Sequence, residues 1–201
     1  MKTLTLILAF LPLVVFSLLA KYLPSGYIGV AALAAAVVAL VAILTSHPVW
    51  PPKILNVCSL ALFALLAVLG FSLGQGDDSW LATWGGAGVG IVLGTIILVL
   101  IPVVPFTEQF ARESTPQAYW SSPTFKKINR VLSIAWGLAI FAVGASRVLA
   151  AAVGRHSSHH VIELLFSLAV PLAIVVYMLK FSKSYPDRVT QGSPGAASVS
   201  R

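Results

Sequence analysis

Charged side chains are scarce in this chain of 201 residues. Asp, Glu, Lys and Arg together make up 9% of it, whereas a soluble domain carries about 25%. So few charges cannot solvate the surface of a water-soluble protein, which excludes an ordinary soluble globular class. Cysteine is nearly absent as well, and the single Cys58 excludes an intramolecular disulfide.

Recognisable catalytic motifs are also missing. The sequence has no Gly-rich phosphate loop ending in Gly-Lys-Ser, no Gly-x-Ser-x-Gly turn, and no pair of carboxylates within an apolar stretch. The four histidines stand in loops or at the ends of apolar stretches, where they cannot hold a haem between two spans. We therefore expect no enzymatic activity, no catalytic residues and no cofactor.

Apolar sequence is what the chain has in abundance, since 58% of its residues are hydrophobic. A helix needs roughly 17–25 apolar residues to cross a bilayer, and in lipid such a run satisfies its backbone only as a helix. The sequence predicts an all-α, polytopic membrane protein: one six-helix domain over residues 1–182, with a cytoplasmic amphipathic loop at 105–130, and a disordered tail at 183–201. The six predicted spans are residues 4–20, 27–45, 54–73, 85–104, 131–153 and 161–179.

The net charge of +7 does not indicate a nucleic-acid partner, because the basic residues stand near the ends of the apolar stretches instead of forming one patch. Lys and Arg beside a span set its orientation and meet anionic lipid headgroups. Lys21 and Arg155 fall on one predicted side, and Arg147 falls inside the fifth stretch. The other basic residues fall on the opposite side, which we predict to be cytoplasmic together with both termini: Lys2, Lys53, Arg112, Lys126, Lys127, Arg130, Lys180, Lys183, Arg188 and Arg201.

The first stretch could instead be a cleaved signal peptide. We expect it to be retained as a span, because Leu18 stands where a small residue would precede the cleavage site and Pro12 interrupts the apolar run.

Small residues recur along the fourth stretch at a spacing that favours close helix packing. Gly86, Gly90 and Gly94 stand four residues apart on one predicted helix face. Small residues at this spacing let helix backbones approach closely in lipid. We expect this face to pack within the bundle; the alternative is a dimer face in a homo-oligomer.

Arg147 is the most costly residue to place in lipid, because it lies inside the fifth stretch. It could reach the headgroups or form an intramembrane ion pair with Glu163, the acid at the start of the sixth stretch. The alternative is a role in binding an anion or another substrate. Together with Pro12, Pro102 and Pro171, which could break helices, this alternative describes a small transporter or permease.

A second polar cluster precedes the sixth stretch. On one continuous helix, His156 and His160 would share a face with Glu163 and could bind Zn²⁺ or a similar cation, as in a metal-linked membrane enzyme. Ser157 and Ser158 favour a loop and a helix cap, which would leave the histidines exposed without a metal.

The loop at 105–130 interleaves aromatic and basic residues. Thr107 is predicted to cap a short helix, and the segment is typical of one that lies on anionic lipid or docks a protein partner. The residues expected to make these contacts are Phe106, Phe110, Arg112, Trp120, Lys126 and Lys127.

Two sequence patterns resemble a known family. The run from Phe10 to Phe16, and the run Phe125-Lys126-Lys127-Ile128-Asn129 that leads to Trp136, are similar to the first and a later span of the intracellular septation protein A family of bacterial inner-membrane proteins. The resemblance implies a non-enzymatic protein of the bacterial cytoplasmic membrane, linked to the cell envelope, division or membrane homeostasis and to partners there. Arg147 stands where that family tends to have a second Asn, which puts any shared polar contact at that position in doubt.

Overall fold

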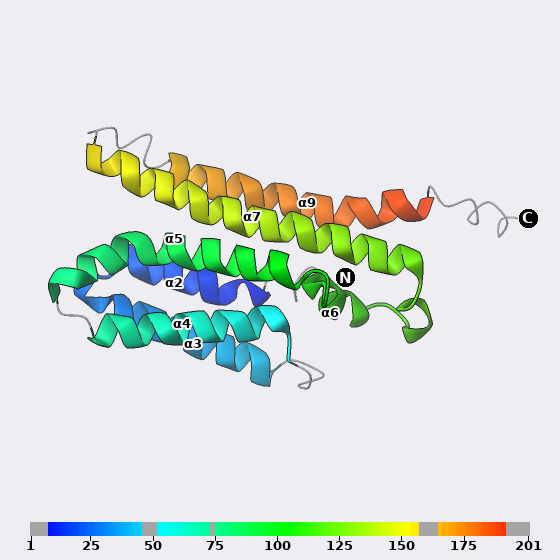
Figure 1. Cartoon of the computed structure of the whole chain (residues 1–201), viewed down its shortest axis with the longest axis horizontal. Helices are drawn as coiled ribbons and strands as arrows, with labels where there is room; N and C mark the ends of the chain where they lie inside the picture. Colours follow the sequence, from blue (N-terminus) through cyan, green and yellow to red (C-terminus); the bar gives the residue numbers. More distant parts are fainter. Residues whose placement is uncertain (1–7, 46–51, 73–74, 157–164, 192–201) are drawn as a thin grey trace, which may run out of the picture.

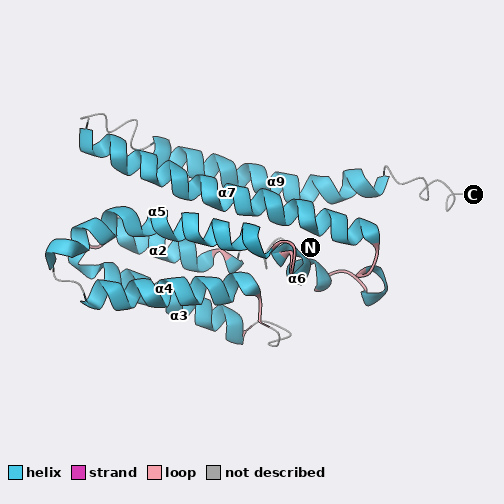
Figure 2. Cartoon of the chain, in the orientation of Figure 1, coloured by secondary structure: helices cyan, strands magenta, loops and turns pink. Residues whose placement is uncertain are grey.

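The computed structural model describes residues 8–45, 52–72, 75–156 and 165–191, and within these ranges the chain is helical and has no strand (Figures 1 and 2). Short 3₁₀ turns lie at Ser25–Tyr27 and Gln117–Tyr119, and a π-helical turn at Leu165–Ala169. The α-helices are α2 (Leu11–Tyr22), α3 (Ile28–Leu44), α4 (Ile54–Ser72), α5 (Gln75–Leu100), α6 (Phe106–Arg112), α7 (Pro123–His156) and α9 (Val170–Gln191).

Three of these helices contain a segment long and apolar enough to cross a membrane: Ile54–Ser72, Thr83–Leu100 and Pro123–Ala152. Helices α2 and α3 are also apolar but shorter. The all-helical prediction is therefore confirmed, and the length and composition of these three helices mark a membrane protein.

The observed helices differ from the predicted ones at three boundaries. Helix α5 begins at Gln75, ten residues before the start of the span predicted at 85–104. Helix α7 begins at Pro123 instead of near residue 131, so the loop that ends at residue 130 was predicted too long. Proline suits the first turn of a helix.

The third difference is at the carboxyl end, where α9 continues to Gln191 and the prediction of disorder from residue 183 is wrong for 183–191. Aromatic rings one turn apart stabilise this extension, because Phe181 stacks on both Tyr177 and Tyr185, at 6.2 and 5.2 Å between ring centroids. Trp136 of α7 also donates a hydrogen bond to Ser182 Oγ, at 2.8 Å, which ties this part of α9 to α7.

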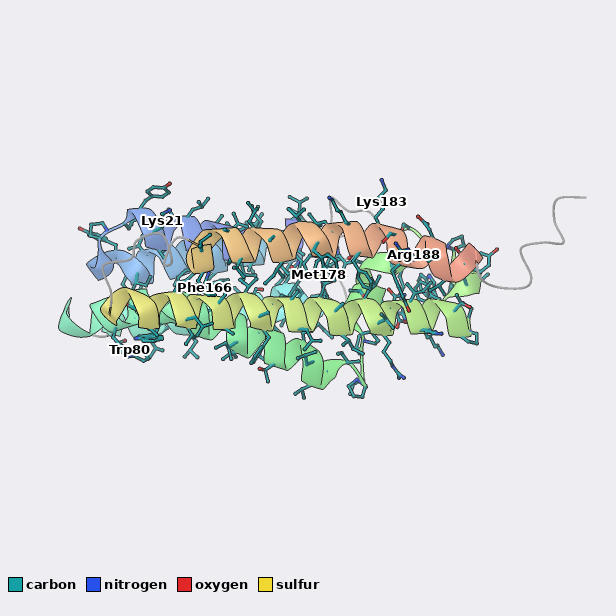
Figure 3. The ribbon with its side chains drawn as sticks, turned by 90° about the horizontal axis from the view of Figure 1, so that it is seen from above. Lys21, Trp80, Phe166, Met178, Lys183 and Arg188 are labelled. Atoms are coloured by element: carbon teal, nitrogen blue, oxygen red, sulfur yellow. The ribbon has the colours of Figure 1, made fainter. Side chains whose placement is uncertain are left out.

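Successive long helices run antiparallel, so their ends meet in a regular way (Figure 1). Helices α4 and α7 begin, and α3, α5 and α9 end, at the end of the bundle that carries α6; we call this the α6 end. Lys183 and Arg188 lie toward this end of the molecule, whereas Lys21 and Trp80 lie toward the opposite end (Figure 3).

Two groups of buried side chains form the core. The group near the α6 end joins Leu93 of α5 and Trp136 of α7 to Phe106 and Phe110 of α6. The other group joins Phe16, Phe63 and the alanines of α3, such as Ala31 and Ala35. Because alanine is small, α3 packs closely against α4.

Glycines bring α5 and α7 into backbone contact, as their spacing predicted. A Cβ atom added to Gly94 would lie 2.6 Å from the backbone nitrogen of Phe141, and one added to Gly144 would lie 2.6 Å from that of Ile91. A Cβ added to Gly90 would lie 2.8 Å from the Cα of Gly144. Backbone atoms cannot give way as flexible side chains do, so these positions require glycine.

We therefore predict that Gly94→Ala lowers the free energy of unfolding by at least about 2 kcal/mol, because the added methyl group overlaps α7. The matched control is Gly88→Ala in the same helix, where an added Cβ meets nothing within 4 Å. The control should leave stability unchanged or raise it by less than about 1 kcal/mol. Thermal unfolding of the full chain in detergent measures both effects, and equal effects would contradict the packing described.

Candidate functional site at the α6 end

An ion pair joins α6 to the start of α4. Lys53 Nζ lies 2.5 Å from Glu113 Oε1, and the Lys53 side chain is only 9% exposed. The same ammonium lies 4.9 Å from the centroid of the Phe110 ring, on which it makes a cation–π contact. Gln109 Oε1 accepts a hydrogen bond from the backbone N–H of Ile54, at 2.8 Å, and so satisfies one of the unpaired donors of the α4 amino terminus.

A buried hydroxyl network joins α6 to α7. Thr107 Oγ1 donates to the carbonyl oxygen of Asn129 at 2.8 Å, and the Thr107 N–H donates to Ser133 Oγ at 3.2 Å. The prediction that Thr107 caps α6 is therefore wrong: Pro105 is the N-cap residue, and the Thr107 hydroxyl is directed to α7.

Two of the aromatic residues expected to contact lipid or a partner are instead part of the core. Phe106 and Phe110 are 2% and 1% exposed, because one face of the short helix α6 packs into the space between α4 and α7. Their burial anchors α6 and leaves neither ring at the surface.

The other predicted contact residues lie outside this core. Arg112 donates to Glu108 Oε1 at 2.6 Å and lies over the ring of Trp120, with 4.9 Å between its Cζ and the ring centroid. Trp120 Nε1 in turn donates to the carbonyl of Thr115 at 2.9 Å. Lys126 and Lys127 are exposed on the first turns of α7.

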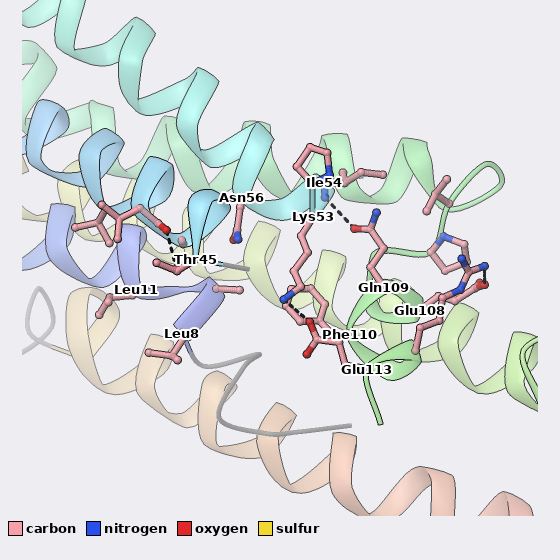
Figure 4. A pocket seen from close by; sticks show the side chains of 18 of the residues that line it. Leu8, Leu11, Thr45, Lys53, Ile54, Asn56, Glu108, Gln109, Phe110 and Glu113 are labelled. Carbon is pink, nitrogen blue, oxygen red and sulfur yellow. Dashed lines mark hydrogen bonds and ion pairs between the residues drawn. The ribbon is translucent and has the colours of Figure 1, made fainter. Parts of the chain in front are cut away.

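A cavity of about 1300 Å³ opens beside this network (Figure 4). One wall is polar and includes Asn56, whose Oδ1 atom is buried and has no hydrogen-bond partner among the described residues. The polar wall is formed by Lys53, Asn56, Glu108, Gln109, Arg112 and Glu113, and the largely apolar opposite wall by Leu8, Leu11, Val37, Val38, Val41, Thr45 and Val103.

Arg147 lies between three helices. Its guanidinium donates to Ser17 Oγ of α2 at 2.9 Å, and a Cβ added to Gly86 of α5 would lie 3.1 Å from its Nη1. Ser17 itself donates to the carbonyl of Leu13 at 2.6 Å. The partner expected from the sequence, Glu163, lies outside the described residues.

The expected metal cluster falls largely outside the part of the chain that the structure describes. His156 is the last residue of α7, and nothing is described of its side chain or of His160 and Glu163. Among the described residues, no group of three His, Cys, Asp or Glu side chains could hold a metal ion.

The three prolines expected to break spans stand near helix ends. Pro12 and Pro171 each follow the first residue of their helix, α2 and α9, and Pro102 follows the last residue of α5 by two positions. Pro171 also comes directly after the π-helical turn at Leu165–Ala169. At Pro12, proline is tolerated in the first turn because its missing N–H would have no partner there.

Comparisons with protein-family models, with curated proteins and with solved structures give no significant match to this chain.

Sequence reasoning did not single out Lys53, Asn56, Gln109 or Glu113 as site residues. Asn56 could have been found from the sequence. Its side-chain amide stands in the first turns of a long apolar stretch, and burying an amide costs free energy unless it has a hydrogen-bond partner. The pairing of Lys53 with Glu113 carried no such signal, since the two residues are far apart in the chain and meet only when α6 packs on α4.

We predict that Glu113→Gln lowers the free energy of unfolding by about 3 kcal/mol, because it leaves the buried Lys53 ammonium without its counter-charge. The control is Glu108→Gln, which removes the partner of the half-exposed Arg112 and should cost less than about 1 kcal/mol. Thermal unfolding of the detergent-solubilised protein measures the stability of both variants. A loss for Glu113→Gln as small as that for Glu108→Gln would show that the Lys53 pair does not hold α6 in place.

Proposed function

We propose that this chain is a non-enzymatic, multi-pass protein of the bacterial cytoplasmic membrane that acts as a scaffold through its α6 end. In this proposal the chain crosses the membrane six times with both termini in the cytoplasm, and the α6 end faces the cytoplasm. There it meets anionic lipid headgroups and a protein partner of the cell envelope or division machinery. The charge bias of the sequence supports this orientation.

The observation that carries the proposal is a rigidly held segment with an exposed aromatic and basic rim. The contacts of Lys53, Thr107 and Gln109 anchor α6 to two long helices. The residues that follow leave Tyr119 60% exposed, and Lys126 and Lys127 are exposed on the first turns of α7. A fixed surface of this composition suits binding better than catalysis, because aromatic and basic side chains supply contact area and charge at low cost in entropy.

A link to the envelope or to division rests on the resemblance to the septation protein A family. Two residues of that pattern, Asn129 and Trp136, lie on the part of α7 that receives α6 and α9. This position supports a structural role for the pattern in holding the proposed binding surface.

Site-specific photo-crosslinking in bacterial cells tests the proposal. A photoreactive amino acid at Tyr119 should capture one envelope protein, because this ring projects from the anchored segment. The same substitution at Tyr22, which lies at the opposite end of the bundle and is 76% exposed against 60% for Tyr119, is the control and should not capture that protein.

Two outcomes decide between support and rejection. Repeated capture of one envelope protein from Tyr119 supports the scaffold, provided that the double variant Lys126→Gln with Lys127→Gln weakens this capture. Crosslinks from Tyr119 to lipid alone, or the same products from Tyr119 and Tyr22, contradict it.

A transport function is the second candidate, because Arg147 lies within the bundle and donates to Ser17 there. Transport requires water to reach this pair, whereas a scaffold does not. For the scaffold we predict that a thiol placed by Ser17→Cys, in a Cys58→Ala background, resists a membrane-impermeant maleimide, while Tyr22→Cys reacts in the same background. Mass spectrometry measures the labelled fraction. Labelling of both thiols would favour a transporter.

A further inference from the structure

The cavity at the α6 end joins two kinds of surface in one space. Its apolar wall comes from α2, α3 and the residues after α5, and its polar wall comes from the start of α4 and from α6 (Figure 4). At about 1300 Å³ it exceeds the range of roughly 300–1,000 Å³ that is usual for pockets that bind drug-sized ligands. These features suit an elongated molecule with one polar end.

In the proposed orientation the cavity would lie near the boundary between hydrocarbon and headgroups. It lies where α3 ends at Leu44 and α4 begins at Ile54, both of them apolar helices. Leu11 and Val41, which line the apolar wall, are 41% and 50% exposed, so an acyl chain could lie along this wall. The ligand class that meets these conditions is a membrane lipid.

The charges of the polar wall select among headgroups. The wall holds two cations, Lys53 and Arg112, and two carboxylates, Glu113 and Glu108, so its formal charge is zero. An anionic headgroup would meet both carboxylates without an excess of positive charge to compensate. A zwitterionic headgroup, with a phosphate and an ammonium, can face both signs.

Two further observations favour a primary ammonium over a quaternary one. Asn56 is 2% exposed, and its Oδ1 atom needs a hydrogen-bond donor, which an ethanolamine ammonium has and a choline lacks. Choline is recognised on aromatic faces. The aromatic rings that line this cavity, Phe110 and Trp120, already carry the cations of Lys53 and Arg112 at 4.9 Å from each ring centroid.

We infer that this cavity binds one phospholipid with a phosphoethanolamine headgroup, whose phosphate faces Lys53 and Arg112 and whose ammonium faces Asn56 and the two carboxylates. The inference goes beyond the proposed scaffold function, because it requires neither a protein partner nor the exposed rim at Tyr119. It requires only that the α6 end lies at the headgroup level of a bilayer.

Native mass spectrometry of the full chain, delipidated in detergent and titrated with lipid, tests the inference. Dioleoyl phosphatidylethanolamine should bind with one molecule per chain and about tenfold more tightly than dioleoyl phosphatidylglycerol or phosphatidylcholine. Equal binding of the three lipids, or no retained lipid because a segment of the chain itself fills the cavity, would overturn the inference.

A pair of variants separates the cavity from the general lipid surface. The larger side chain of Val41→Trp should fill part of the cavity beside the apolar wall and reduce binding of phosphatidylethanolamine about tenfold or more. Val30→Trp is the matched control, because Val30 lies on the same helix, is similarly exposed, at 41% against 50%, and does not line the cavity. Equal losses in the two variants would assign the bound lipid to the outer surface and reject the site.

Two headgroup variants complete the test. Asn56→Leu removes an unsatisfied buried atom, so it should preserve or raise the thermal stability of the lipid-free protein while weakening phosphatidylethanolamine binding about tenfold. Glu108→Gln gives the polar wall a net positive charge and should shift the preference toward phosphatidylglycerol. Unchanged lipid selectivity in both variants would refute the assigned headgroup, whatever the outcome of crosslinking at Tyr119.

Discussion

The backbone contact between α5 and α7 is the constraint on which the rest of the structure depends. In lipid, the hydrophobic effect contributes little to the association of two apolar helices, because lipid tails are as apolar as their side chains. The attraction must therefore come from close van der Waals packing. Gly90, Gly94 and Gly144 permit that approach. The segment that joins α5 to α7 then folds as α6, which packs against α7 and buries Phe106 and Phe110 in the core.

The polar contacts at the α6 end follow from this connection. The pair of Lys53 with Glu113 is largely buried, whereas the pair of Arg112 with Glu108 has one half-exposed member. The first therefore ties the end of α6 to the start of α4, whereas the second lies closer to the surface of the bundle. Both cations also rest on aromatic rings, which keeps their long side chains in place beside the cavity.

The sequence predicted some parts of this structure well, for physical reasons. The starts and ends of α3 and α4 agree closely with the apolar stretches, and the four-residue spacing of Gly86, Gly90 and Gly94 indicated close helix packing before any contact was known. Both signals are local and depend only on composition and helical period. The all-helical fold follows from the same information.

The candidate site was less predictable because its contacts are not local. Thr107 has the side chain of a helix cap, yet it bonds to α7, and nothing in the spacing distinguishes these two uses. The extension of α9 depends on contacts with α7 such as that of Ser182 with Trp136, and its polar composition favoured disorder.

The partners of α2 have a consequence for biogenesis. Phe10 stacks on Trp136 with 4.8 Å between ring centroids, and Ser17 accepts a hydrogen bond from Arg147, so two contacts of the first described helix come from α7. The ribosome makes α2 long before α7. Until α7 has been made, Phe10 and Ser17 lack these two contacts. The final packing of α2 can therefore form only after α7 has been translated.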